Sequence, residues 1–160
     1  MVDLHVAFVP TPKKIVRAML QLASLRHGET LFDLGAGDGR IIIDAARKFG
    51  AHAVGVEIAP DSITRIKERL AATGTKAELI ESDIFKVDLT PADVITIYLS
   101  ESANARLVHK FNNELKPGTR IVSLDYPLPG WVPKRELEVS ASGIPRRIYL
   151  YQKNRDTINE

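Results

Sequence analysis

The sequence predicts an α/β fold: a mostly parallel seven-stranded sheet with helices on both faces, ending in an antiparallel hairpin. Two observations predict it. Up to residue 128, short apolar runs typical of strands alternate with amphipathic helical runs, and the connections are short. After that, "ELEVSAS" and "RRIYLYQK" read as two strands joined by the turn "GIP". Alternating strands and helices imply right-handed crossovers, which build a parallel sheet.

Four runs have the periodicity of amphipathic helices: 11–25, 39–50, 59–74 and 101–118. In the first, Thr11 is a candidate N-cap and Pro12 suits the first turn. In the third, Pro60 opens the helix and Gly74 closes it. Each helix therefore has a start or stop signal that is independent of its apolar face.

The expected strands are 30–35, 52–58, 77–83, 92–99, 119–128, 136–142 and 146–153. Polar residues stand near the ends of the first four, at Asp33, Glu57, Asp83 and Tyr98. Open α/β sheets bind ligands beyond the carboxyl ends of their strands. We therefore expect these side chains to meet at one edge of the sheet.

The composition of the chain limits the classes of protein to which it can belong. The chain has 160 residues, 44% of them apolar, a net charge of +2 and no cysteine. This suits one domain, with an N-terminal segment and first helix (1–29), an α/β core (30–153) and a tail (154–160). The absence of cysteine excludes disulfides, thiolate zinc sites and a cysteine nucleophile. With no secretion signal or transmembrane run in the sequence, we expect a cytoplasmic protein.

The stretch "LFDLGAGDGR" indicates the ligand. It lacks the lysine and hydroxyl residue of a P-loop, and its glycines follow G-x-G-x-G rather than the dinucleotide pattern G-x-G-x-x-G. Asp33 and Asp38 stand where a pyrophosphate would lie, and their carboxylates would repel an anion and favour a cation. A cofactor with an ammonium and a sulfonium fits better, and we predict S-adenosylmethionine.

The other acids fit the same cofactor. Glu57 can accept hydrogen bonds from the ribose hydroxyls, and Asp83 can accept one from the adenine amino group. Ile84 can donate its backbone N–H to the adenine ring, and Ile58 can pack on its face. Each feature alone has a structural alternative, a tight turn or a helix cap. Three of them in order on successive strands favour the cofactor.

The motifs carry a resemblance to a known family. "LFDLGAGDGR", "VGVEIAP" and "IESDIF" resemble successive motifs of the Rossmann-like class I methyltransferases. "FVPTP" and "LDYPLPGWVP" resemble an archaeal family of broad-specificity protein lysine methyltransferases, related to the mitochondrial enzyme that methylates a lysine of the ATP synthase c-subunit. The resemblance implies that residues 8–11 lie over the methionine end of the cofactor, although Thr11 can equally serve as a helix cap with Phe8 and Val9 packed behind it. The candidate cofactor residues are Phe8, Val9, Pro10, Thr11, Asp33, Gly35, Ala36, Gly37, Asp38, Glu57, Ile58, Asp83 and Ile84.

The sequence argues against some classes of methyl acceptor. After the fourth strand, "IYLSES" lacks the "[DNS]PP[YFW]" motif of amino-group methylation on nucleobases, and the scattered histidines His5, His27, His52 and His109 offer no metal site. The resemblance implies lysines on protein partners, and the abundant lysines of this chain make the chain itself a candidate acceptor. The net charge of +2 gives no strong electrostatic attraction to nucleic acid or to an anionic membrane, so neither is expected as a partner. A nucleic-acid or small-molecule methyltransferase, and a binding module without activity, remain alternatives.

Lysine methylation requires a neutral amine, and deprotonation of free lysine at pH 7 costs roughly 4–5 kcal/mol. We expect Tyr98 to line an apolar entry channel and Glu101 to accept the proton through water, unless Glu101 only favours the helix dipole. Trp131 is expected either at the channel rim or in simple loop packing. Basic residues near the chain end, including Arg146 and Arg147, are expected on solvated faces.

Overall fold

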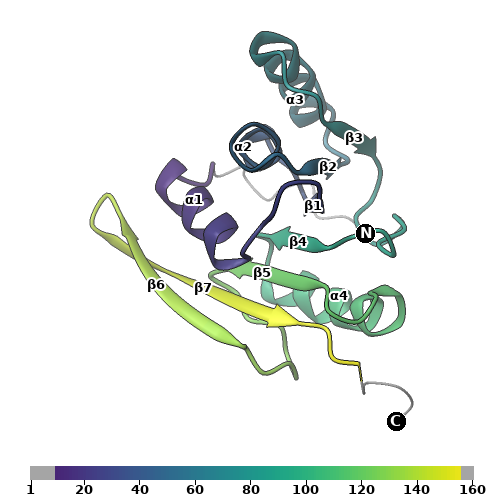
Figure 1. Ribbon diagram of the computed structural model, residues 1–160, viewed down its shortest axis with the longest axis vertical. Helices are drawn as coiled ribbons and strands as arrows, with labels where there is room; N and C mark the ends of the chain where they lie inside the picture. Colours follow the sequence, from purple (N-terminus) through teal and green to yellow (C-terminus); the bar gives the residue numbers. More distant parts are fainter. Residues whose placement is uncertain (1–9, 156–160) are drawn as a thin grey trace.

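The computed structural model describes residues 10–155 and confirms the predicted fold (Figure 1). The helices are α1 (Lys13–Leu22), α2 (Arg40–Phe49), α3 (Pro60–Thr73) and α4 (Glu101–Glu114). The strands are β1 (Thr30–Leu34), β2 (His52–Glu57), β3 (Glu78–Glu81), β4 (Val94–Ile97), β5 (Arg120–Leu124), β6 (Arg135–Ala141) and β7 (Ile144–Gln152).

The sheet has the strand order β3-β2-β1-β4-β5-β7-β6. The strands from β1 to β5 are parallel, while β7 runs antiparallel to both β5 and β6. Asp33 lies opposite Thr96, Glu57 opposite Glu81, and Ile97 opposite Ser123. The register therefore brings the carboxyl ends of five strands to one edge, as expected.

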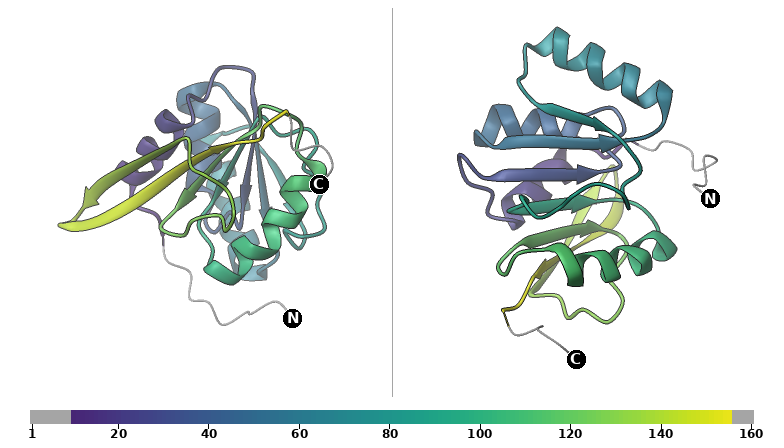
Figure 2. Two further views of the ribbon diagram at one scale, coloured as in Figure 1. Left: turned by 90° about the horizontal axis from the view of Figure 1, so that it is seen from below. Right: turned by 90° about the vertical axis from the view of Figure 1, so that its right-hand side faces the viewer.

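The two faces of the sheet are covered unequally (Figures 1 and 2). Apolar side chains of α1 and α2, together with Ile66 of α3, pack on one face. On the other face, Leu107 and Phe111 of α4 pack against the alternate residues of the same strands. The hairpin of β6 and β7 continues the sheet past β5, and Val139 and Ala141 of β6 pack against the core that contains α1.

Several predicted boundaries differ from the observed ones, and three of the differences have a clear local cause. Helix α1 begins at Lys13 with Pro12 as its N-cap and no side-chain cap, so Thr11 does not cap it. The fifth strand ends at Leu124, because Asp125 adopts a left-handed backbone conformation with φ of 66°. The hairpin turns at Ser142 and Gly143, which both have positive φ, as in the two-residue turns that match strand twist.

Candidate active site

The glycine loop connects β1 to α2 at the carboxyl edge. The backbone N–H groups of Gly35 and Ala36 both donate to Val56 O on β2, at 2.9 and 3.0 Å. Gly35 has φ of 81°, and a Cβ there would lie 3.1 Å from Leu99 Cδ2. Gly35 is therefore required both by its backbone conformation and by the close approach of Leu99.

Glu57 organises this loop. Its Oε1 accepts from the N–H of Gly37 at 2.9 Å, and its Oε2 accepts from those of Ile58 and Ala59 at 2.9 and 3.0 Å. A carboxylate has about four lone-pair positions, so Glu57 can still accept from hydroxyl groups. The side chain that the sequence assigns to the ribose also fixes the loop that precedes α2.

Asp33 is a buried carboxyl group. Its side chain is 3% exposed, and its Oδ1 accepts from Thr96 Oγ1 at 2.9 Å. Burial raises the pKa of Asp33 to about 7 against the lowering effect of the Thr96 bond, and the carboxylates of Glu57 and Asp38 raise it further. A cation bound beside these three acids would relieve their repulsion.

Asp38 is paired with two arginines, which the sequence interpretation did not include. Arg40 Nη2 lies 2.6 Å from its Oδ2, and Arg69 Nη1 of α3 lies 2.8 Å from the same oxygen. These guanidinium groups outweigh the cost of partial burial and lower the pKa of Asp38. The charge of Asp38 is therefore largely balanced within the protein by the two arginines, and its contact with the cofactor stays a prediction.

Arg40 also connects the glycine loop to the segment before α1. Its Nη1 donates to the backbone oxygen of Thr11 at 2.8 Å, and Thr11 is buried. Pro10 precedes it and is exposed. This places Thr11 beside the glycine loop, and its position over the methionine end of the cofactor stays a prediction. Phe8 and Val9 lie outside the described residues.

The groups assigned to adenine lie at the ends of β2 and β3. Ile58 is 41% exposed and follows Glu57, which is buried, so its apolar side chain is open to a ligand. Asp83 is half-buried, and its Oδ1 accepts from the N–H of Phe85 at 2.9 Å, which shapes the turn that contains Ile84. Ile58 and the Asp83 turn follow strands that are neighbours in the sheet, so they can border one ligand.

Tyr98 follows β4 and is half-buried. Its ring lies nearly parallel to that of Tyr126, with centroids 6.4 Å apart, and Arg146 of β7 lies over it at 5.3 Å. Glu101 is exposed at the first residue of α4, whose N-cap is Ser100. Trp131 packs edge-on against Phe111 and Tyr151, which is the loop-packing alternative rather than the channel rim.

Sequence reasoning missed several residues that shape this edge. The partners of the acids, Thr96, Arg40 and Arg69, depend on strand register and helix packing. An acid directly after a strand is a signal that could have identified Asp125. The predicted fifth strand, 119–128, extends beyond this residue, so the signal was not recognised. Arg146 was expected on a solvated face, yet its side chain is only 15% exposed and pairs with Asp125.

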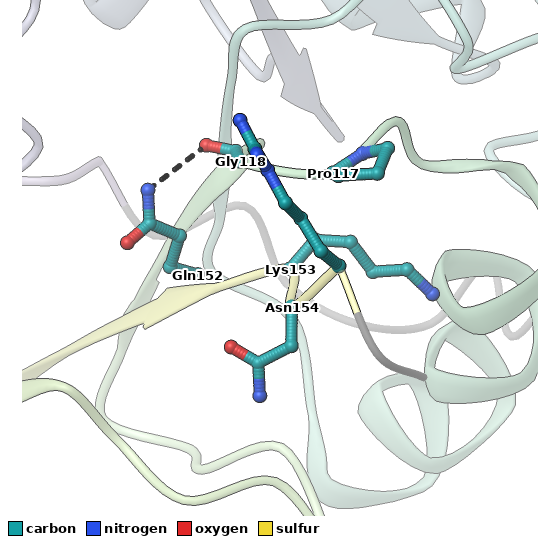
Figure 3. A pocket seen from close by; sticks show the side chains of 6 residues that line it. Pro117, Gly118, Gln152, Lys153 and Asn154 are labelled. Atoms are coloured by element: carbon teal, nitrogen blue, oxygen red, sulfur yellow. Dashed lines mark hydrogen bonds between the residues drawn. The ribbon is translucent and has the colours of Figure 1, made fainter. Parts of the chain in front are cut away.

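A separate polar pocket lies at the opposite edge of the sheet (Figure 3). It is lined by Pro117, Gly118, Gln152, Lys153, Asn154 and Arg155. Gln152 Nε2 donates to Gly118 O at 3.3 Å, and Lys153 Nζ donates to Asn112 O at 2.7 Å. Burial lowers the pKa of Lys153. These residues precede β5, end β7 or follow it, so the pocket is distinct from the carboxyl edge.

Two further findings concern only residues 10–155. No cluster of three or more histidine, aspartate or glutamate side chains in this part of the chain could hold a metal ion. In the same range, no helix is long and apolar enough to cross a membrane.

The residues present fit S-adenosylmethionine. A buried acid with neighbouring carboxylates suits a cationic ligand, a glycine loop allows close approach, and an exposed isoleucine beside Glu57 suits an adenine ring. Fold and site together define a class I methyltransferase, the class that uses S-adenosylmethionine as methyl donor. Residues 33–135 match the ANTKMT methyltransferase domain, and the chain belongs to this family.

Individual relatives agree with this assignment. A protein-lysine N-methyltransferase of Saccharolobus islandicus is 43% identical over 92% of this chain and 93% of its own length. The human lysine N-methyltransferase of the ATP synthase c-subunit is 32% identical over 79% of this chain, which covers 54% of that protein. The crystal structure of an RNA methyltransferase from Salinibacter ruber with S-adenosyl-L-homocysteine superposes with a TM-score of 0.86 at 38% identity, covering 92% of this chain and 95% of that one.

Proposed function

We propose that this chain transfers methyl groups from S-adenosylmethionine to the side-chain amines of lysines in proteins. The observation that carries the proposal is the 43% identity, over nearly the whole of both chains, to an archaeal protein-lysine N-methyltransferase.

We assign the cofactor along the edge in the order of the strands. The adenine lies at β3, where the Asp83 turn and Ile58 border it, and the ribose lies at β2, where Glu57 accepts from its hydroxyls. The methionine ammonium lies at β1 beside Asp33. The raised pKa of Asp33 supports this assignment, since a cation would favour its charged form.

This order puts the methyl group next to β4, the neighbour of β1 on the other side. The bound cofactor supplies an activated methyl on a sulfonium. The lysine nitrogen must present its lone pair in line with the departing sulfur, and after transfer its extra proton leaves to solvent. Tyr98 follows β4 and is our candidate for orienting the amine. Glu101 is our candidate for passing the proton on through water.

The proposal is tested by incubating the protein with methyl-labelled S-adenosylmethionine and a cell lysate divided into protein and RNA fractions. Mass spectrometry of the labelled proteins should find mass increases on lysine Nζ. A sample without lysate reports methylation of the chain on itself. If protein carries no label, the proposed acceptor is wrong.

An RNA acceptor is the second candidate. One observation favours it: the similar crystal structure from Salinibacter ruber is described as an RNA methyltransferase. Label in the RNA fraction with unlabelled protein would support this alternative. The absence of a "[DNS]PP[YFW]" motif at 97–102 argues against a nucleobase amino group as the acceptor.

A further inference from the structure

Four residues meet at the carboxyl ends of β4 and β5, next to the predicted position of the methyl group. Tyr98 follows β4, Asp125 and Tyr126 follow β5, and Arg146 reaches them from β7. We call these four residues the acceptor corner. Only Tyr98 among them has a role assigned above.

Three hydrogen bonds join Arg146 and Asp125 in the ion pair of the acceptor corner. Arg146 Nη2 lies 2.7 Å from Asp125 Oδ2, and its Nε lies 3.0 and 3.1 Å from the two carboxylate oxygens. The side chains are 15% and 28% exposed. The N–H of Asp125 donates to Arg147 O at 2.7 Å, although Asp125 has a left-handed backbone conformation. A strained non-glycine residue held by several bonds is typical of functional sites.

The same pair supports the aromatic rings. The Arg146 guanidinium lies 5.3 Å from the centroid of the Tyr98 ring, and Tyr98 lies nearly parallel to Tyr126 in an offset arrangement. Asn104 of α4 holds the turn from the other face of the sheet: its Nδ2 donates to Tyr126 O at 3.0 Å and to Pro127 O at 3.2 Å. Asn104 is fully buried, and its Oδ1 has no hydrogen-bond partner within the described chain.

The charges of the corner matter because the acceptor amine must lose its proton. An unpaired carboxylate near the amine would favour the ammonium form, and an unpaired guanidinium would disfavour it. When the carboxylate and the guanidinium are paired, their opposite effects on the protonation of the amine cancel. The pairing with Asp125 is also the leading reason that the pKa of Arg146 is raised.

We propose that the Asp125–Arg146 pair positions Tyr98 and Tyr126 around the incoming amine and balances the charge of Asp125, so that the amine can be neutral. This inference rests on the proposed function. Asp125 and Arg146 are positioning residues, because they act on the amine through the tyrosines and through their charges. Other charged or titratable groups on the surrounding elements are Asp33 on β1, Arg120 on β5, Glu101, Arg106, His109, Lys110 and Glu114 on α4, Lys13, Lys14 and Arg17 on α1, Arg135, Glu136 and Glu138 on β6, and Arg147, Tyr149 and Tyr151 on β7.

The test measures kcat against pH at saturating protein acceptor, because kcat reports ionisations in the complex with substrate. Arg146→Gln leaves Asp125 unpaired, so the rising limb of the profile should move to higher pH by about one unit. Asp125→Asn leaves Arg146 unpaired, and the limb should move by a similar amount to lower pH. The double variant, which lacks both charges, should return close to the wild-type position.

Controls separate this role from folding and from cofactor binding. Arg147→Gln is the matched control, because Arg147 is the next residue on β7 and pairs with Glu136 at 3.0 Å on an exposed face. It should leave the profile unchanged. Arg146→Lys keeps the charge and should restore the limb even if kcat stays low. All variants should bind S-adenosyl-L-homocysteine within about twofold of wild type in calorimetry, because the corner lies beyond the cofactor groups.

Opposite shifts with unchanged cofactor affinity support the proposal. Equal losses of kcat without a shift, or shifts of one sign in both single variants, overturn it while leaving lysine methylation intact, since the wild type still labels lysine. If the wild type labels no lysine, both the proposed function and this inference fall together. If one charge-removing variant does not fold, the direction of the shift in the other, compared with Arg147→Gln, decides the matter.

Discussion

At the ends of β1, β2 and β3, recognisable motifs supply both the glycine loop and the acid that fixes it: Glu57 accepts from the backbone N–H groups of Gly37, Ile58 and Ala59. At the ends of β4 and β5, side chains outside such motifs hold one another, as Arg146 does with Asp125. The first half can therefore be recognised from its motifs. The second half depends on four elements meeting, so its chemistry can change while the cofactor half stays the same. The predictions below test this division.

The largest expected effect concerns Asp33. Its pKa is about 7 in the folded protein against an ordinary value of 3.8, so the folded state holds an extra proton between these values. Its contribution to the free energy of unfolding is therefore greatest at low pH and is lost as the pH rises from about 4 to about 7. In Asp33→Asn this loss disappears, a difference of up to about 4 kcal/mol across the window.

Urea unfolding of wild type and Asp33→Asn at a series of pH values measures this difference. Cofactor affinity should follow the same group, because only the charged form attracts the methionine ammonium. In the wild type, affinity should fall as the pH drops below about 7, and in Asp33→Asn it should be low at every pH. Parallel unfolding profiles for the two proteins would contradict the assignment of Asp33.

Glu57→Gln should have the next largest effect. Its new amide nitrogen cannot accept from Ile58 and Ala59, and the ribose loses a charged acceptor. We expect affinity for S-adenosyl-L-homocysteine to fall about a hundredfold, equivalent to about 2.7 kcal/mol. Glu81→Gln is the matched control, because Glu81 lies opposite Glu57 in the register and is exposed beside Lys67. If both variants bind equally well, Glu57 is not a cofactor residue.

Substitutions of Tyr98 test the acceptor half of the site, and we expect them to change kcat rather than cofactor binding. Tyr98→Leu removes the ring that packs with Tyr126 and Arg146, and kcat should fall about thirtyfold through poor positioning. Tyr98→Phe keeps the ring, and kcat should fall only about threefold, because we assign the hydroxyl no role as a base. Cofactor affinity should be unchanged in both. Equal large losses would instead make the hydroxyl essential.

Glu101→Gln should have the smallest effect. Glu101 is exposed at the start of α4, so water can take the proton in its place. We expect kcat to fall less than about threefold, with a loss of about 0.5 kcal/mol in stability from the weaker interaction with the helix dipole. Initial rates at several pH values, with thermal unfolding, measure both. A tenfold loss of kcat would make Glu101 a general base.

Much of the fold could be predicted because local signals agree with the overall topology. Every expected helix and strand exists, and the strand ends meet at one edge. The errors fall where a single residue decides a boundary. Thr11 has the chemistry of a cap, but Pro12 takes the capping position. Asp125 follows an apolar run, and although aspartate is among the residues enriched in the left-handed region, its residue type alone does not show that the strand ends there.

The candidate site likewise contains residues that could be predicted from the sequence and pairs of residues that only the structure identifies. Glu57 and Asp83 were predicted at strand ends, and the structure brings their strand ends together. The compensation of Asp38 by Arg69 and the pairing of Arg146 with Asp125 join residues 31 and 21 positions apart. Nothing in a single sequence specifies which of many arginines meets which acid, so these pairs required the structure.

The aromatic packing of Trp131 has a practical consequence. It is the only tryptophan of the chain, and its ring contacts are Phe111 of α4 and Tyr151 of β7, on the face of the sheet covered by α4. Intrinsic fluorescence excited at the indole will therefore follow separation of α4 from the sheet. Ligands arriving at the carboxyl edge should leave that emission unchanged, which gives each variant an internal optical reference for intact packing.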